Sequence, residues 1–285
     1  MDTTLLNKVS QLSALCAQLQ AQLSVTHTKL VVVEAPQVED PLLPWLREVT
    51  ADWTKDEAVL MLRNMHTLPD DLAGIRLPLL KHLHVTFGLD KSDARANDNY
   101  ALKWCARNGH LEVVKYLKEA FGLDKSDAQA DYNHALRKRA ENGHLEVVKY
   151  LKEAFGLDKS DAQANANHAL RLSAENGHLE VVKYLKEAFG LDKSDARAQD
   201  NYALRLSAEN GHLEVVKYLK EAFGLDKSDA RAQDNFALRS SAANGHLGVV
   251  KYLKEAFGLD KSDARAQDNY ALKWCARNGH LEVVK

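Results

Sequence analysis

From Phe87 onward, the chain repeats one sequence every 34 residues. The pair Phe-Gly and the triplet Asn-Gly-His both return at this interval, and twelve of the 14 glycines lie in these two places. The phenylalanines of the pair are Phe87, Phe121, Phe155, Phe189, Phe223 and Phe257, and the histidines of the triplet are His110, His144, His178, His212, His246 and His280. A period of this length is typical of repeat proteins, in which each copy is one supersecondary unit. The chain therefore contains six copies, the sixth cut short at Lys285.

One copy, taken from residue 189 to 222, contains two helical patterns. Leu213, Val216 and Leu219 recur at three-residue steps, which predicts an amphipathic second helix that ends near Gly224. A first helix is predicted from Asn201 or Tyr202 to about Glu209. The glycine that follows it suits the left-handed residue with which many helices end.

Two polar residues of the copy are expected to cap these helices. Asn201 keeps its identity in all six copies, and its side chain would accept from the free N–H groups at the start of the first helix. In the Asn-Gly-His triplet, the glycine makes the turn and the imidazole caps the second helix. Asp226 and Asp229 predict a short third helix through Ala232, which links one copy to the next.

A unit this small cannot bury enough apolar surface alone, so neighbouring copies must stack on one another. No stretch of the chain alternates as a strand does. We therefore predict an all-α fold, an α-solenoid of stacked helix-turn-helix repeats over residues 87–285.

The stretch Asn201–Leu219, NYALRLSAENGHLEVVKYL, resembles the ankyrin repeat. Its GHLEVV portion matches the opening of that family's second helix, and Leu204 and Ala208 stand where the family's first helix has a leucine and an alanine. The family's Thr-Pro-Leu-His is replaced by Tyr202-Ala-Leu-Arg. Its hairpin between repeats is replaced by LDKSDARA at 225–232, predicted as a short helix. The sequence is similar to divergent ankyrin repeats of large DNA viruses and unicellular eukaryotes.

The segment before the repeats is predicted to cap the array. Residues 54–86 are a degenerate N-terminal cap repeat, of the kind that solenoid ends require. Thr54-Lys-Asp-Glu57 is a capping box and predicts a helix from Glu57 to about Met65. Residues 31–53 contain a proline-containing linker followed by one more helix. We expect this helix to run to residue 53 and to cover the cap repeat.

Residues 1–30 carry a different pattern, an amphipathic, coiled-coil-like helix. Apolar residues alternate steps of four and three along a predicted oligomerisation seam of Leu5, Val9, Leu12, Cys16, Leu19 and Leu23. Self-association through this helix predicts a homo-oligomer. A helix folded back on the array explains the same pattern, and the sequence leaves both interpretations open.

Composition excludes several classes of function. The formal net charge of −2 offers no basic surface for nucleic acid, and no apolar run is long enough to cross a membrane. Three cysteines make no disulfide framework, which favours a reducing compartment and a cytoplasmic location, with a virus particle as the other expected place. No catalytic, metal-binding or cofactor-binding motif occurs, and identical copies supply no unique constellation of differing groups. We expect no enzyme, no cofactor and no metal.

Partner binding is predicted where the copies differ, since the second helix is nearly the same in all of them. One position of the first helix varies from tryptophan to lysine to serine, which no close-packed core site accepts, so we expect it to be exposed. In ankyrin-like stacks the first helices line the concave binding surface. The predicted partner-binding residues are Trp104, Lys138, Leu172, Leu206, Ser240 and Trp274, with Arg107 and Arg277 one turn further on. Drift after recent duplication explains the same variation.

The sequence thus predicts a protein-interaction scaffold that binds another protein, and itself through the N-terminal helix. The alternative is a structural or assembly component of a virus particle or filament, with the repeats as a spacer. Because the last copy begins a helix with no second half, we expect a longer array or end-to-end assembly.

Overall fold

The computed structural model describes residues 42–65 and 73–284. The predicted coiled-coil helix, with its oligomerisation seam, lies outside these ranges. The chain divides into two compact units, which we call unit 1 (up to Asp127) and unit 2 (from Ala128). Within the described ranges the chain forms helices and turns and no strands, as the all-α prediction requires.

Unit 1 begins with the elements predicted to cap the array. Its helices are α2 (Leu43–Val49), α3 (Lys55–Arg63), α4 (Ala73–Phe87), α5 (Lys91–Ala94), α6 (Ala96–Arg107) and α7 (Leu111–Ala120), and the short α8 (Lys125–Ala128) contains the boundary between the units.

The predicted helix bounds in this region need correction. The capping box is confirmed: the Thr54 hydroxyl accepts from the Glu57 N–H, and the Glu57 carboxylate accepts from the Thr54 N–H. Because Thr54 is the N-cap, α3 starts at Lys55, before the predicted Glu57, and it ends at Arg63. The helix expected to reach residue 53 ends at Val49, where the Thr50 hydroxyl donates to the Leu46 carbonyl.

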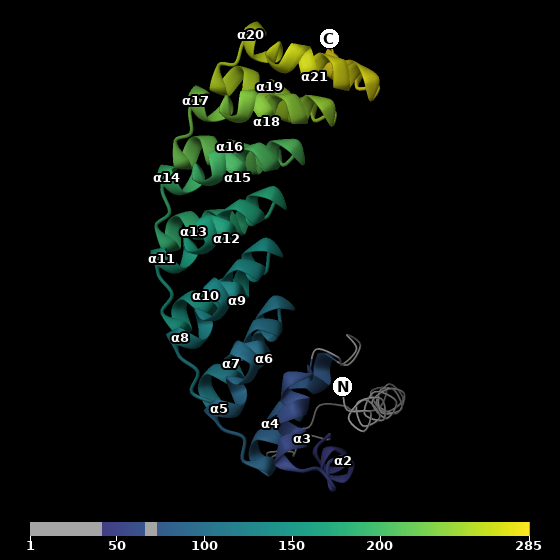
Figure 1. Cartoon of the computed structure of the whole chain (residues 1–285), viewed down its shortest axis with the longest axis vertical. Helices are drawn as coiled ribbons and strands as arrows, with labels where there is room; N and C mark the ends of the chain where they lie inside the picture. The colour runs from purple at the N-terminus through teal and green to yellow at the C-terminus, as the bar shows by residue number, and fades with distance from the viewer. Residues whose placement is uncertain (1–41, 66–72, 285) are drawn as a thin grey trace, which may run out of the picture. The chain divides into compact units, whose positions relative to one another are not determined.

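Unit 2 repeats a first helix, a second helix and a short helix (Figure 1). The first helices are α9 (Ala130–Glu141), α12 (Ala164–Glu175), α15 (Ala198–Glu209), α18 (Ala232–Ala243) and α21 (Ala266–Arg277). The second helices are α10 (Leu145–Phe155), α13 (Leu179–Phe189), α16 (Leu213–Phe223), α19 (Leu247–Phe257) and α22 (Leu281–Val284). The short helices are α11 (Lys159–Ala162), α14 (Lys193–Ala196), α17 (Lys227–Ala230) and α20 (Lys261–Ala264), so the short helix predicted through Ala232 ends at Ala230.

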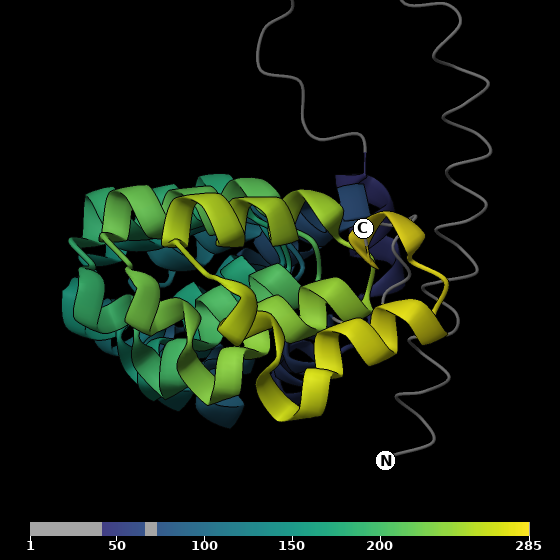
Figure 2. The same ribbon diagram turned by 90° about the horizontal axis from the view of Figure 1, so that it is seen from above.

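Like helices stack on like helices in unit 2. Each first helix packs on the next first helix, and each second helix on the next second helix, so that two layers form along the stack (Figure 2). Ala203, Leu204 and Ala208 of α15 are completely buried, and Val216 and Leu219 of α16 are too. The spacing of Val216 and Leu219 predicted the second helix, and with the buried residues of α15 they form the core between repeats.

The Asn-Gly-His turn joins neighbouring repeats. Gly211 has φ +78° and ends the first helix as predicted. The expected imidazole cap is wrong: His212 precedes α16 without any side-chain bond to that helix, and its ring lies against Gly177 of the preceding repeat. The Asn210 side-chain amide donates to the Glu175 carbonyl of that same repeat at 2.9 Å. Both polar residues of the triplet thus hold neighbouring repeats together.

The second to fourth residues of each first helix of unit 2 are left-handed, which the sequence did not predict. Gln199, Asp200 and Asn201 have φ of +53°, +55° and +59°. The N-cap role expected for Asn201 is wrong, because its Oδ1 is buried and accepts no hydrogen bond. Asparagine tolerates the left-handed region better than most residues, which accounts for its presence at this position in every copy.

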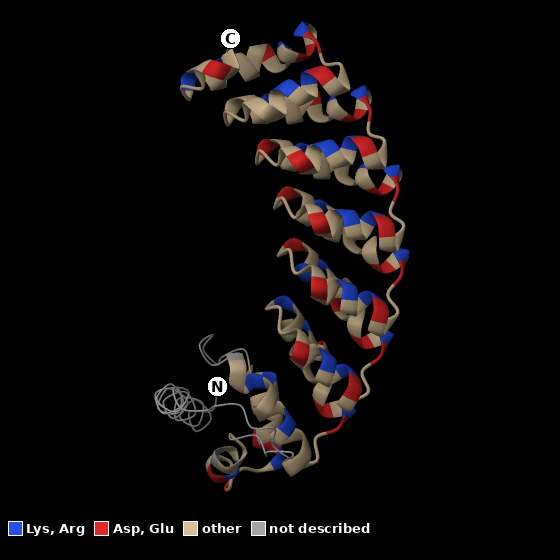
Figure 3. Cartoon of the chain, turned by 180° about the vertical axis from the view of Figure 1, so that it is seen from behind, with Lys and Arg blue, Asp and Glu red and all other residues tan. Residues whose placement is uncertain are grey.

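The short helices form an edge of alternating charge, shown in Figure 3. Asp226 caps α17 in a reciprocal pair with Asp229. The preceding repeat reaches the same two residues: Lys193 Nζ lies 2.8 Å from Asp226, and Arg197 Nε donates to Asp229 at 2.6 Å. Hydrogen bonds from Lys193 and Ser228 hold the pKa of the Asp226 carboxyl well below its usual range. We call this row of short helices the short-helix edge.

Candidate protein-interaction surface

The first helices of unit 2 expose one side of each repeat. On α15 the partly exposed side chains after the left-handed turn are Tyr202, Arg205, Leu206 and Glu209, spaced as one face of a helix, and the residues between them are buried. We call these four positions, repeated on α9, α12, α15, α18 and α21, the first-helix face. The equivalent positions on α6 of unit 1 hold Tyr100, Lys103, Trp104 and Arg107.

The predicted partner-binding residues occupy two of these four positions. In unit 2 the variable position is half-buried at Lys138, Leu172, Leu206 and Trp274, and Arg277 is exposed. In unit 1, Trp104 is half-buried and Arg107 is exposed. The expectation of full exposure is wrong, most clearly for Ser240, which is only 9% exposed. First helices pack directly on one another, so this position lies partly over the neighbouring helix.

Lys138, Trp274 and Arg277 make contacts within their own repeat. Lys138 pairs with Glu141 at 2.7 Å on the same helix. The Trp274 ring lies 5.7 Å from the Tyr270 ring, and the Arg277 guanidinium lies 4.6 Å from the indole centre. In unit 1, the guanidinium of Arg76 lies 5.0 Å from the centre of the Trp104 ring. Tryptophan at these sites is therefore held in place while one part of it stays accessible.

Sequence reasoning missed the other two positions of the face. The Arg205 guanidinium lies between two rings, 5.9 Å from Tyr202 of its own repeat and 5.1 Å from Phe236 of the next. The pattern continues on both sides and forms an arginine–aromatic ladder of Arg171, Tyr202, Arg205, Phe236, Arg239 and Tyr270. The sequence contains a signal for this ladder, since the position of Arg205 is basic in all six copies and the position of Tyr202 is aromatic or histidine.

Each arginine of the ladder also fixes the left-handed turn. Arg205 Nε donates to the Asp200 carbonyl at 2.8 Å, and its Nη2 donates to the Gln199 carbonyl at 3.1 Å. Arg171 and Arg239 make the same two bonds in their repeats. Because a planar guanidinium bonds two carbonyls at once, it offsets part of the cost of three left-handed residues.

Burial and neighbouring groups determine the protonation of the titratable side chains on the first-helix face. Burial, reinforced by the nearby Arg137 and Arg171, lowers the pKa of His168 to about 4, so this imidazole is neutral at neutral pH. The Tyr202 hydroxyl donates to Glu175 at 2.7 Å, and burial together with this carboxylate raises the tyrosine pKa. Leu172 and Leu206 form an apolar strip among these polar neighbours.

The nucleophilic side chains of the first helices are buried next to the face. Ser173, Ser207 and Ser241 are completely buried, and each hydroxyl donates to a carbonyl of its own helix. Burial raises the pKa of the Cys105 thiol to about 12, which makes it unreactive. These side chains offer no exposed nucleophile.

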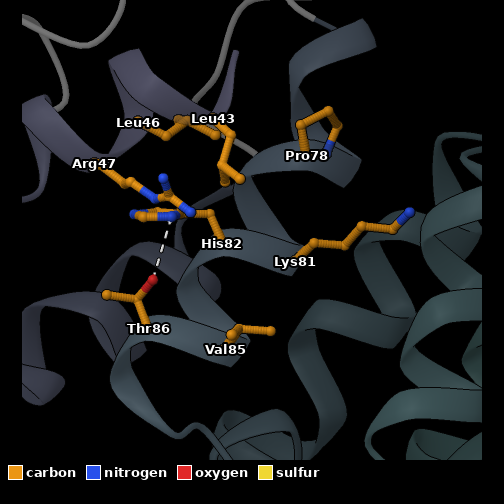
Figure 4. A pocket seen from close by; sticks show the side chains of 8 residues that line it. All are labelled: Leu43, Leu46, Arg47, Pro78, Lys81, His82, Val85 and Thr86. Carbon is orange, nitrogen blue, oxygen red and sulfur yellow. Dashed lines mark hydrogen bonds between the residues drawn. The ribbon is translucent and has the colours of Figure 1, made fainter. Parts of the chain in front are cut away.

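Unit 1 has a separate small cavity of about 260 Å³ between α2 and α4 (Figure 4). Its lining is mostly apolar and also includes Arg47 and Lys81. The His82 ring is fixed between Thr50 at 2.7 Å and Thr86 at 3.2 Å. Because the Thr50 hydroxyl donates to a backbone carbonyl, His82 Nε2 donates to Thr50 and its Nδ1 accepts from Thr86. His82 therefore has a structural role and carries no acid–base assignment.

Two further searches of the described residues were negative. They contain no group of three or more histidine, cysteine, aspartate or glutamate side chains placed to hold a metal ion. None of their helices is long and apolar enough to cross a membrane.

The comparisons with known proteins agree with this geometry. A search of curated proteins returned no match. A family model described as ankyrin repeats, three copies, matches residues 73–162, 136–230 and 204–285. These matches cover the cap helix α4 and all the repeats that follow it, and the fold is the stacked helical array that this family forms. The chain belongs to the ankyrin-repeat family.

Proposed function

We propose that this chain is a scaffold that binds another protein along the first-helix face. Ankyrin repeats are generally protein–protein interaction modules. The observation that carries the proposal is the first-helix face itself, where accessible side chains change from repeat to repeat on a backbone held rigidly by its neighbours. A pre-organised surface loses little conformational entropy when it binds.

Leu172 and Leu206 are the proposed centre of the contact. They occupy the variable position in adjacent repeats, and both are half-buried, so a partner can complete their burial. The tryptophans at this position, Trp104 in unit 1 and Trp274 in unit 2, are proposed anchors, as are Arg107 and Arg277. Large aromatic and arginine side chains contribute most of the binding energy in many interfaces.

The test uses the full chain as bait for proteins from a lysate. Leu172→Lys and Leu206→Lys together place at two repeats the residue that Lys138 already supplies at a third, so the fold should tolerate them. We expect the native chain to retain a protein in stoichiometric amount and the double variant to lose it. The matched control is Lys251→Glu on the exposed side of α19, which should retain the partner. Equal retention by the double variant would contradict the proposal.

We also propose that residues 1–30 join copies of this chain through Leu5, Val9, Leu12, Cys16, Leu19 and Leu23. A repeating seam of apolar residues gives a helix one strip to bury against a second helix. Sedimentation should show an oligomer for the full chain and a monomer for the variant Leu12→Asp, Leu19→Asp. A monomer at all concentrations for the native chain would remove this part of the proposal.

The second proposed function is a structural or assembly role, with a virus particle or filament as the setting. Near-identical repeats supply length and repeating geometry, which favours it. The bait experiment separates the two functions, because an assembly component should recover only further copies of itself. An intracellular, non-catalytic role without nucleic acid or lipid is common to both proposals.

A further inference from the structure

The Asn-Gly-His turns place a row of imidazoles along unit 2, each against the glycine of the preceding repeat. A Cβ added to Gly177 would lie 2.6 Å from Nδ1 of His212, and the other rings lie equally close to their glycines. We call the four residues His178, His212, His246 and His280 the histidine seam. We propose that the histidine seam makes the stack proton-sensitive, so that mild acid loosens the repeats of unit 2.

Position on the helix is the first reason. His178, His212 and His246 each stand at the N-cap of a second helix, and none of their side chains accepts from its N–H groups. The N-terminal end of a helix carries a partial positive charge, which disfavours a second positive charge beside it. A neutral imidazole is therefore preferred at His212.

Neighbouring charges are the second reason. The charges that act on His212 are the imidazoles His178 and His246, one repeat away on either side. The nearby carboxylates already have partners: Glu175 on α12 accepts from Tyr202, and Glu214 in the first turn of α16 pairs with Lys217. Glu209 ends α15, on the face that the partner is proposed to bind. Protonation of either neighbouring ring therefore makes protonation of His212 less favourable.

Burial acts in the same direction. It is the largest cause that lowers the pKa of His212, ahead of the two neighbouring imidazoles, while a hydrogen bond to the Glu175 carbonyl opposes it. At His144, burial, Arg139 and His178 lower the pKa together. A histidine that is harder to protonate when folded stabilises the fold fully above its unfolded pKa of about 6.5, and this stabilisation is lost as the pH falls below that value.

The acidic residues of the short-helix edge respond in a different range of pH. The pKa of Asp192 and that of Asp226 are both lowered, first by a lysine of the preceding repeat. Their contribution is lost only below the aspartate value of about 3.9. Loosening between about pH 5 and 6.5 is therefore assigned to histidine and not to this edge.

The test compares the full chain with the triple variant His178→Gln, His212→Gln, His246→Gln. Urea unfolding of unit 2 is measured at about pH 7.5 and about pH 5.5, on either side of the unfolded histidine pKa. His82 and His168 remain in both proteins, so their contribution cancels. We expect acid to raise the unfolding equilibrium constant of the native chain at least ~2-fold more than that of the variant, since a histidine that binds its proton more readily in the unfolded state favours unfolding as the pH falls.

A second variant removes the concern that glutamine disturbs the turn. His212→Phe keeps a ring against Gly177 but cannot be protonated, so it should remove a share of the pH dependence while the turn stays packed. NMR titration should show the His212 imidazole with a pKa below that of a free histidine. An equal response to acid in the native chain and the triple variant, or unperturbed imidazole titrations, would overturn the proposal.

Discussion

Two regions of unit 2 differ in how their residues change from repeat to repeat. Along the short-helix edge the sequence Lys-Ser-Asp-Ala is the same in every copy, and its side chains reach across to the next repeat, as Lys193 does to Asp226. On the first-helix face, the position of Leu206 changes in most copies, and Lys138 makes its ion pair within its own helix. The position of Lys193 is constant where its contact crosses to the next repeat, and the position of Lys138 is variable where its contact stays within one helix.

The arginine–aromatic ladder refines this comparison. It lies on the first-helix face, yet its positions stay basic and ring-bearing because each guanidinium packs against a ring of the next repeat. The ladder positions keep their chemical character from repeat to repeat while the amino acid itself changes. The face therefore contains both a structural ladder and a variable strip beside it.

A large loss of stability is expected at the glycines between repeats. In Gly177→Ala the new Cβ would lie 2.6 Å from the His212 ring, at a residue whose φ is +76°. Left-handed strain and overpacking together should lower the free energy of unfolding by about 3 kcal/mol. Gly190→Ala is the matched control, since its φ is +72° and nothing lies within 4 Å. Its cost should be about 1 kcal/mol. If denaturant unfolding showed the same loss of unfolding free energy for both variants, the histidine seam would not be closely packed.

A smaller loss is expected in the ladder. Arg205→Lys keeps the charge but loses the two-carbonyl fork and the stacking on Phe236. We expect unfolding to become easier by about 1–2 kcal/mol, from one or two hydrogen bonds and the ring contact. Lysine already stands at the same place in Lys103 and Lys273, so the fold should survive. No change in the denaturation midpoint would remove the structural role assigned to the ladder.

The left-handed turn offers an opposite, stabilising change. Ala166 has φ +54°, where glycine has no Cβ to strain. Ala166→Gly should raise the free energy of unfolding by about 0.5–1 kcal/mol, after the entropy cost of glycine is subtracted. Ala169→Gly, three residues later in a buried helical position, should lower it by about 1 kcal/mol or more. Thermal unfolding of both variants would show whether glycine stabilises the protein at residue 166 and destabilises it at residue 169, as the two backbone conformations require.

The smallest effect is the response of the short-helix edge to acid. Hydrogen bonds from Lys159 and Ser194 lower the pKa of Asp192. The ionised carboxylate stabilises the fold, so this contribution is present above the unfolded aspartate value of about 3.9 and is lost as the pH falls below it. The pair is largely exposed, with both side chains more than a third accessible, so the change in melting temperature should be small. Lys159→Met should reduce this dependence below about pH 4 and leave the melting temperature near neutrality almost unchanged. A steeper acid transition in the variant would contradict the stabilising role assigned to the ionised carboxylates of the short-helix edge.

Much of the fold could be predicted from the sequence because helical spacing and glycine are local signals. Leu213, Val216 and Leu219 gave the second helix, and Gly211 gave its turn. The roles of Asn201 and His212 could not be obtained this way, since both depend on a neighbouring repeat or on a backbone conformation that no glycine marks. For the same reason the candidate surface was predicted only in its variable half. The arginine ladder depends on a stacking distance that the sequence does not contain.

The most direct test of the account compares two leucines that lie two residues apart on α15. Leu206 is on the variable strip and Leu204 is completely buried between repeats. Leu206→Lys should leave the free energy of unfolding within about 0.5 kcal/mol of the native value, as surface substitutions do. Leu204→Lys should lower it by about 4 kcal/mol or more, because it buries an unpaired charge. Similar losses for the two variants would contradict the division between the buried core between repeats and the variable strip on the first-helix face.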